Sequence, residues 1–310
     1  MCSFFDKGCR RKQVKNIQLW DGNNEVRLTA YLLDNSQEFN TNRNRPAVIV
    51  CPGGAYLWTS DREAEPVALR FAAQGYHVFV LRYTTHYTSR PDFQNMLPGN
   101  PNSKHPQPLF DLAKAILTVR QQAAEWFIDT DKIAVCGFSA GGHLAASLGA
   151  HWQDEFVTAM LQADKNLLKP SALILGYPLI DYILLKEEAD ADQSEAARGI
   201  KAHVNIAAFG TADPEPEELI KRSPVNYVTS NMPPTYIWHT ADDALVYAAN
   251  ALRLAAALAK HKVPYELHVF ESGVHGLSLS NETTAAEPAH VNPHCEIWVE
   301  LAMKWLSKRF

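Results

Sequence analysis

The sequence predicts an α/β fold, in which a mostly parallel central sheet is covered by helices on both faces. The main observation is that short, continuously apolar segments alternate with segments of helical periodicity along most of the 310 residues. A strand buried on both faces of a parallel sheet has such a continuous apolar pattern. The apolar content of 46% is enough for one large domain of about 250–300 residues.

The first elements are expected to form an antiparallel hairpin at one edge of the sheet. Asn16–Trp20 and Glu25–Leu33 alternate apolar and polar residues, and Asp21–Asn24 has the composition of a turn. The next segments are, in order, a polar loop (Gln37–Arg45), a strand (Pro46–Cys51), a helix that stops at Gly75 (Arg62–Gln74), a strand (Tyr76–Tyr83), a long surface loop (Thr84–Pro108), a helix (Leu109–Phe127), a strand (Lys132–Cys136) and a helix to about His151.

The alternation continues to the C-terminus. The remaining strands are predicted at Ala172–Tyr177, Pro233–His239 and Tyr265–Phe270, and the helices at Ile180–Leu185, Glu187–Phe209, Val246–His261 and Pro293–Phe310. Residues 1–310 are therefore expected to form a single domain. Residues from about 179 to 230 are the weakest in pattern and are expected to form either a small cap or irregular loops.

Charge and composition exclude several classes of partner. The formal charge is −5 and no basic stripe is present, which argues against binding to nucleic acid or to an anionic membrane. No run of about 18 apolar residues could span a bilayer. Met1–Gly8 lacks the apolar core of a signal peptide, so a cytoplasmic location is expected, although a chain whose leader had been removed would look the same. The oligomeric state cannot be inferred.

The cysteines do not suggest a disulfide framework. Their number is odd and their spacing is scattered, at Cys2, Cys9, Cys51, Cys136 and Cys295. Cys51 and Cys136 lie in predicted core strands, where cysteine acts as a small apolar residue. A reducing compartment is therefore favoured.

The strongest chemical signal is Gly137-Phe138-Ser139-Ala140-Gly141, between a predicted strand and a small-residue helix. G-x-S-x-G in this context predicts a nucleophile elbow, a tight turn that exposes the serine at the carboxyl edge of the sheet. A side chain at either glycine would press against the strand or the helix start. Ser139 is therefore the candidate nucleophile, at a helix N-terminus whose free N–H groups favour a developing oxyanion.

A glycine-rich loop, Pro52–Tyr56, directly follows an earlier strand. Acyl transfer needs N–H donors for the tetrahedral oxyanion. One donor commonly comes from the residue after the nucleophile, here Ala140, and others come from such a loop, where Gly54 and Ala55 fit. The alternative is a plain Pro-Gly-Gly turn.

A carboxylate that could orient a catalytic histidine follows the strand that ends at His239. Asp242 and Asp243 both qualify. We favour Asp243, because it lies three residues before Val246, the apolar start of the next predicted helix. Asp213 follows a helical segment rather than a strand and is discounted.

The candidate base is His275, in Ser272-Gly273-Val274-His275-Gly276 after the last strand. Small neighbours on a loop would let this imidazole reach the serine. None of the other histidines has both this position and glycine on either side.

Other candidate residues have less specific patterns. His290, His294 and Cys295 have a helical i, i+4 spacing, but Pro293 interrupts it and no fourth ligand is evident, so neither a metal nor another cofactor is expected. His86 and His105 lie in the long loop and could line the substrate mouth or belong to the surface. Tyr56, Trp58 and Tyr83 follow strand ends and could contact substrate or pack the rim.

With these residues in place, the chain resembles the α/β-hydrolase superfamily over nearly its whole length, with the order Ser139, Asp243, His275. The segments Cys51–Tyr56, Arg62-Glu63, Gly75-Tyr76, Gly137–Ala145 and Trp238–Asp243 resemble the acetyl xylan esterase and feruloyl esterase-like carboxylesterases. Pro52 stands where hormone-sensitive lipases have a histidine, and no long N-terminal helical cap is evident. Both departures disfavour a lipase.

The resemblance implies an α/β-hydrolase fold and a serine carboxylesterase that removes short acyl groups, often acetyl, from xylan or xylo-oligosaccharides. The expected partner is therefore a small-molecule or oligosaccharide ester. One alternative is a serine peptidase or amidase on the same fold. Another is a non-catalytic binding protein that uses a hydrolase pocket.

Overall fold

The protein has the α/β-hydrolase fold, built on one eight-stranded sheet with the order β1-β2-β4-β3-β5-β6-β7-β8. The structure is a computed structural model that describes residues 14–36, 38, 43–191 and 195–310. The strands are β1 (Val14–Trp20), β2 (Asn23–Tyr31), β3 (Arg45–Cys51), β4 (His77–Arg82), β5 (Ile128–Phe138), β6 (Ala172–Gly176), β7 (Thr235–Thr240) and β8 (Tyr265–Phe270). The described residues do not include most of the predicted loop Gln37–Arg45, nor do they include Cys2, Cys9 or the segment Met1–Gly8.

The predicted hairpin is confirmed at one edge of the sheet, where β1 pairs antiparallel with β2. Strand β2 is also antiparallel to β4, whereas β4, β3, β5, β6, β7 and β8 are parallel to one another. Strands β3, β6 and β7, and the second half of β5 from Ile133, are buried along almost their whole length, which explains their continuous apolar sequences.

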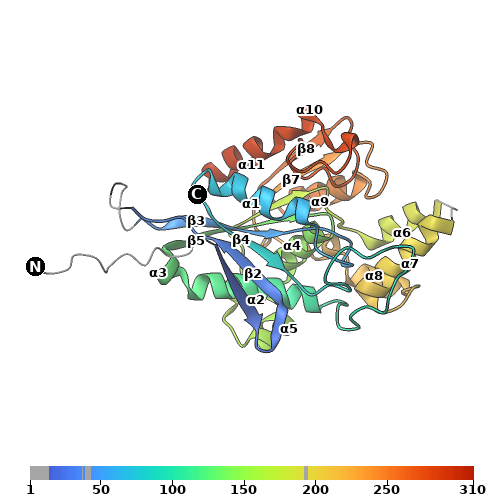
Figure 1. Cartoon of the computed structure of the whole chain (residues 1–310), viewed down its shortest axis with the longest axis horizontal. Helices are drawn as coiled ribbons and strands as arrows, with labels where there is room; N and C mark the ends of the chain where they lie inside the picture. The colour runs from blue at the N-terminus through green and yellow to red at the C-terminus, as the bar shows by residue number, and fades with distance from the viewer. Residues whose placement is uncertain (1–13, 37, 39–42, 192–194) are drawn as a thin grey trace, which may run out of the picture.

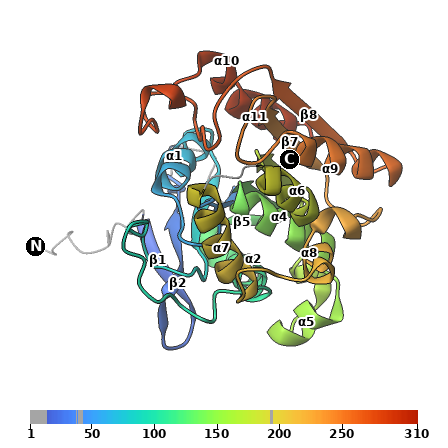
Figure 2. The same ribbon diagram turned by 90° about the vertical axis from the view of Figure 1, so that its right-hand side faces the viewer.

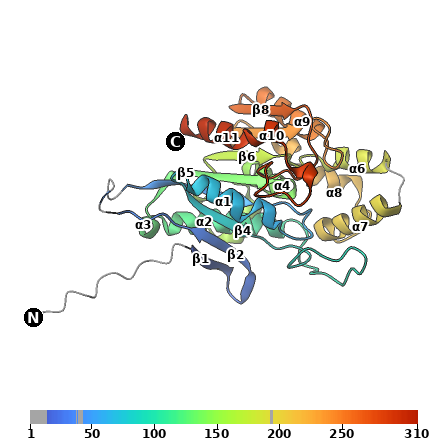
Figure 3. The ribbon, with the colours of Figure 1, turned by 45° about the horizontal axis from the view of Figure 1, so that its top comes forward.

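Helices cover both faces of the sheet, as Figures 1 and 3 show. Helices α1 (Glu65–Ala72), α10 (Pro293–Glu296) and α11 (Trp298–Ser307) pack on one face, around a core that includes Phe71 and Trp298. The other face packs against α2 (Gln107–Gln121), α3 (Ala123–Trp126), α4 (Ala140–His151), α5 (Glu155–Leu161) and α9 (Ala249–Lys260).

Several helix boundaries differ from the predicted ones. The predicted helix Arg62–Gln74 begins with a separate 3-10 turn at Asp61–Glu63, and α1 follows it with a proline in its first turn. The predicted helix Leu109–Phe127 is divided into two helices by a turn at Gln122. The second helix ends at Trp126, and Phe127 after it has a φ of 57°, in the left-handed region. The predicted helix from Val246 begins at Ala249, because Asp243 binds the backbone before it into a turn.

The segment 179–230 is largely helical rather than irregular. It contains α6 (Tyr182–Ala191), α7 (Glu195–Phe209) and α8 (Pro216–Lys221), of which α8 has no counterpart among the predicted helices. Figure 2 shows α6 and α7 in front of the sheet, and Figure 1 shows them at the opposite end of the molecule from α3. The long loop before α2 is fastened to α7, because the His105 N–H donates to the Ala208 carbonyl and the Ser103 hydroxyl donates to the Ala207 carbonyl.

In the described part of the chain, no helix is long and apolar enough to cross a bilayer. The three described cysteines, Cys51, Cys136 and Cys295, are buried thiols. Cys51 and Cys136 lie in β3 and β5 and have the apolar role predicted for them.

Candidate active site

The loops that follow β3, β5, β7 and β8 carry the four groups of candidate residues. These strands are parallel neighbours on either side of β6, so their carboxyl ends lie along one edge of the sheet. Residues more than 200 positions apart in the sequence therefore meet at this edge. Ligand sites of α/β sheets form at this edge for the same reason.

Ser139 occupies the tight turn between β5 and α4. Its φ of 51° lies in the left-handed region, which a non-glycine residue adopts only under strain. A Cβ at Gly137 would lie 2.1 Å from the Gly141 carbonyl oxygen, and a Cβ at Gly141 would lie 2.0 Å from the Cys51 oxygen. The predicted steric reason for both glycines is therefore confirmed.

The side chains of Ser139, His275 and Asp243 form a hydrogen-bonded chain. His275 Nε2 lies 2.8 Å from Ser139 Oγ, and His275 Nδ1 lies 2.7 Å from Asp243 Oδ2. An ionised carboxylate only accepts hydrogen bonds, so Nδ1 carries the proton and donates it to Asp243. The unprotonated Nε2 is then left to accept the Ser139 hydroxyl proton, which is the arrangement that a general base requires.

Asp243 is almost completely buried and accepts several hydrogen bonds. Its Oδ1 accepts the N–H groups of Leu245 and Val246, and its Oδ2 also lies 3.4 Å from His239 Nε2. Burial alone would raise the pKa of Asp243, but the hydrogen bonds from His239 and His275 outweigh burial and hold this pKa below its usual range. The carboxylate is therefore ionised at neutral pH.

Asp242 has a different position. Its Oδ1 accepts the Gly273 N–H at 2.6 Å, so this carboxylate fastens the loop that carries His275 without contacting the imidazole. Asp213, the residue discounted from the sequence, lies in the turn between α7 and α8.

Three backbone N–H groups lie free beside the serine. Among the hydrogen bonds of the described residues, none is donated by the N–H of Gly54, Ala55 or Ala140. Gly54 has a φ of 118°, and a Cβ there would lie 2.1 Å from the Trp58 oxygen, so only glycine fits. A Cβ at Gly53 would lie 2.9 Å from Ser139 Cβ, which brings this loop directly against the candidate nucleophile.

A buried carboxylate that no sequence pattern marked as functional connects two of these loops. Glu63 Oε2 accepts the Gly53 N–H at 2.7 Å, and Oε1 accepts the Tyr177 hydroxyl at 2.6 Å. The Tyr177 oxygen in turn accepts the Ser278 N–H at 2.9 Å, and its ring packs edge-on against His275 with centroids 5.0 Å apart. Glu63 was noted only as part of a motif, because its neighbours in space are distant in sequence.

A second buried contact holds the loop after β3 from the other side. The Tyr56 hydroxyl lies 2.6 Å from His143 Nδ1, and His143 Nε2 lies 2.6 Å from the Arg222 carbonyl oxygen. Because that carbonyl only accepts, Nε2–H donates to it and Tyr56 donates to Nδ1. Burial lowers the pKa of His143 to about 4, so the imidazole is neutral and keeps this pattern at neutral pH.

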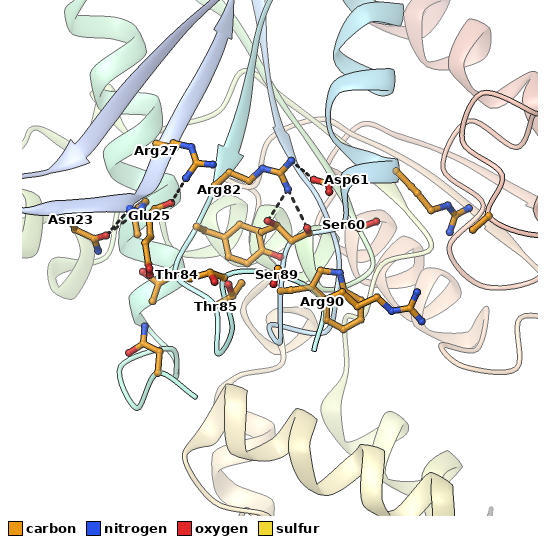
Figure 4. A pocket seen from close by; sticks show the side chains of 18 of the residues that line it. Asn23, Glu25, Arg27, Ser60, Asp61, Arg82, Thr84, Thr85, Ser89 and Arg90 are labelled. Atoms are coloured by element: carbon orange, nitrogen blue, oxygen red, sulfur yellow. Dashed lines mark hydrogen bonds and ion pairs between the residues drawn. The ribbon is translucent and has the colours of Figure 1, made fainter. Parts of the chain in front are cut away.

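The structure separates the three aromatic residues predicted to contact substrate or pack the rim. Tyr56 is 1% exposed and Tyr83 is 3% exposed, and the Tyr83 hydroxyl donates to the Pro52 carbonyl. Burial therefore favours the packing alternative for both tyrosines. Trp58 is partly exposed and borders a cavity of about 950 Å³, which Figure 4 shows.

Three of the other candidate histidines make hydrogen bonds to neighbouring groups, whereas His294 is exposed. His86 Nδ1 lies 3.1 Å from the Asn100 oxygen, and His105 Nε2 lies 3.0 Å from the Tyr182 hydroxyl. His290 Nδ1 accepts the N–H groups of Ala286 and Glu287. No group of three or more His, Cys, Asp or Glu side chains within the described ranges could hold a metal ion.

One family model and several curated proteins are similar in sequence to this chain. A family model named BD-FAE matches residues 33–258. Endo-1,4-beta-xylanase B of Butyrivibrio fibrisolvens is 32% identical over 244 residues, which are 78% of this chain and 34% of that protein. The chain spans about a third to just over half of the first curated relatives that it matches.

Solved structures match over almost their whole length. An acetyl ester-xyloside bifunctional hydrolase from Caldicellulosiruptor lactoaceticus has a TM-score of 0.71 and 32% identity, with 95% of this chain and 96% of that chain covered. The carboxylesterase Cest-2923 from Lactobacillus plantarum has a TM-score of 0.74 and 29% identity, with 96% of each chain covered.

Proposed function

The chain belongs to the BD-FAE family of carboxylic ester hydrolases, and we propose that it is a serine esterase that uses a Ser139–His275–Asp243 triad. The observation that carries this proposal is the continuous hydrogen-bonded chain from Ser139 Oγ through His275 to Asp243. This order of donors and acceptors leaves the serine next to an unprotonated imidazole nitrogen.

The reaction proceeds in two halves. Ser139 Oγ attacks the ester carbonyl carbon while His275 Nε2 takes the hydroxyl proton. The tetrahedral oxyanion is stabilised by the N–H groups of Gly54, Ala55 and Ala140. Its collapse breaks the bond to the alcohol oxygen, which receives the proton from His275, and leaves an acyl-serine.

A water molecule then completes the turnover. His275 Nε2 takes a proton from this water as its oxygen attacks the acyl carbonyl, and the same N–H groups hold the second oxyanion. The proton returns to Ser139 Oγ as the carboxylic acid leaves. Through both halves, the buried carboxylate of Asp243 orients His275 and stabilises the imidazolium.

The proposed substrate is a short acyl ester, with acetyl on xylan or xylo-oligosaccharides as the preferred case. Support comes from the relatives: one is a xylanase, and a solved neighbour is named as an acetyl ester-xyloside hydrolase. A carboxylesterase neighbour with the same fold favours ester over amide cleavage.

The test replaces the nucleophile. Ser139→Ala is expected to abolish hydrolysis of p-nitrophenyl acetate and labelling by a fluorophosphonate probe, with an unchanged circular dichroism spectrum. Substantial turnover by the folded variant would refute the assignment of Ser139. Faster cleavage of an aminoacyl anilide than of p-nitrophenyl acetate by the wild type would favour a peptidase instead.

A further inference from the structure

A large groove lies on the hairpin side of the candidate active site. It has a volume of about 950 Å³, far more than a two-carbon acyl group occupies. Figure 4 shows its walls: Asn23, Glu25 and Arg27 come from the β1–β2 hairpin, and Thr85, Ser89 and Arg90 come from the loop after β4. Neither wall carries a residue of the proposed triad.

The groove begins at the two loops that carry the proposed catalytic groups. Trp58 borders the groove, and its backbone N–H donates to the Gly54 carbonyl, so the two residues share one turn. Arg62, also on its border, has a guanidinium nitrogen 3.9 Å from where a Cβ would stand at Gly276, the neighbour of His275. An ester held between Ser139 and the free N–H groups therefore has this groove beside it.

The lining is suited to a polyhydroxylated molecule. It combines hydroxyl, amide, carboxylate and guanidinium groups with one indole side chain, that of Trp58. Arg90 lies over the Trp58 ring at 6.0 Å. Among the described residues, no acidic side chain forms an ion pair with Arg27, Arg62 or Arg90. Arg27 and Arg62 already donate to backbone carbonyl groups. Among the hydrogen bonds of the described residues, none is donated by the Arg90 guanidinium, so Arg90 is the one of the three whose donors are available.

The same lining disfavours an apolar occupant. A long acyl chain or an aryl group gains its binding energy from burial of apolar surface, which a wall of threonine, serine and arginine side chains does not provide. A sugar ring presents hydroxyl groups around its edge and a C–H surface on its face, so it can satisfy both the polar groups and the indole.

We propose that this groove is the subsite for the alcohol part of the ester, an oligosaccharide that extends from Ser139 past Trp58 toward the β1–β2 hairpin. This inference rests on the proposed esterase function and adds where the saccharide is bound. The donors of Arg90 bind sugar hydroxyls, and the Trp58 ring packs against a sugar face.

The experiment compares two substrates that share the acetyl group. Acetylated xylotetraose can occupy the groove, whereas p-nitrophenyl acetate has no saccharide. The measured quantity is the ratio of kcat/KM for the first substrate to kcat/KM for the second. Arg90→Gln is expected to lower this ratio about three- to tenfold, the effect of losing one or two exposed hydrogen bonds, and Trp58→Phe is expected to lower it as well.

Arg70→Gln is the matched control, because Arg70 is an exposed arginine on α1 that does not border the groove. It should leave the ratio unchanged. If neither Arg90→Gln nor Trp58→Phe changes the ratio, the saccharide does not bind in the groove. If the wild type cleaves p-nitrophenyl acetate but no acetylated saccharide, the groove proposal fails while the esterase proposal stands. If it cleaves neither, the esterase proposal fails.

Discussion

Replacing Glu63 by glutamine should slow catalysis although Glu63 is not one of the proposed reacting groups. The Glu63 carboxylate accepts one hydrogen bond from Gly53, next to the proposed oxyanion donors, and one from Tyr177, which packs against His275. A glutamine of the same shape has a single acceptor oxygen, so its NH₂ group must face one of these two donors.

The expected losses of stability and of rate follow from the two hydrogen bonds that Glu63 accepts. A hydrogen bond to a charged group contributes about 1.5–3 kcal/mol, and an unsatisfied buried donor costs a similar amount. We therefore expect Glu63→Gln to lower the free energy of unfolding by about 2–3 kcal/mol. Removing one oxyanion donor outright costs about 10²–10³ in rate, so loosening the loop that carries two of them should lower kcat about 10- to 100-fold.

The assay is steady-state hydrolysis of p-nitrophenyl acetate, with urea unfolding measured in parallel. The control is Glu65→Gln, because Glu65 also accepts a tyrosine hydroxyl, from Tyr31, but at an exposed position. Its kcat should stay within about twofold of wild type, since exposed pairs contribute little. Tyr177→Phe isolates the second bond, because it leaves the bond between Glu63 and Gly53 in place.

The role of Glu63 is decided by comparing the change in kcat with the change in the free energy of unfolding. If Glu63→Gln is destabilised as expected but keeps kcat within threefold of wild type well below its unfolding temperature, Glu63 is structural and does not position the catalytic loops. A loss of kcat with little change in KM is the expected result.

Two further predictions concern the acidic residues and the buried histidines. Asp243→Asn should lower kcat by about 10⁴-fold, as loss of a triad carboxylate does elsewhere, whereas Asp242→Asn keeps an oxygen that can accept the Gly273 N–H and should cost less than tenfold. Steady-state kinetics of both variants test this, and a larger loss for Asp242→Asn would reverse the assignment. Burial lowers the pKa of both His77 and His143 to about 4, below the value of about 6.5 in an unfolded chain. The unfolded state therefore binds more protons between these values, and stability is fully present above pH 6.5 and falls as the pH drops toward 4. Between pH 7.5 and pH 5 the loss should be about 2 kcal/mol per histidine. Urea titrations at the two pH values measure it, and equal stability at both would show that the imidazoles titrate normally in the folded protein.

Local patterns were enough to predict most of the fold. The strands predicted at Pro46–Cys51, Ala172–Tyr177 and Tyr265–Phe270 agree with the structure within one residue at each end. The first two are apolar throughout because they are buried on both faces, whereas the third is a partly exposed edge strand whose apolar residues alternate with polar ones. Helix ends were found less well, since they depend on side chains such as Asp243, whose hydrogen bonds lie outside the helix.

The sequence by itself determined which residues could carry the chemistry. A serine between glycines after a strand, and an aspartate and a histidine after later strands, are constraints of short range, and parallel strands bring their carboxyl ends together without further information. Only the tertiary structure placed Asp243, and not Asp242, against His275. It also showed that Tyr56 and Tyr83 are buried, that Trp58 borders a groove and that Glu63 is hydrogen-bonded to Tyr177. These outcomes depend on contacts between residues that are 31 to 114 positions apart, where the burial of each side chain is set by neighbours that no local spacing specifies.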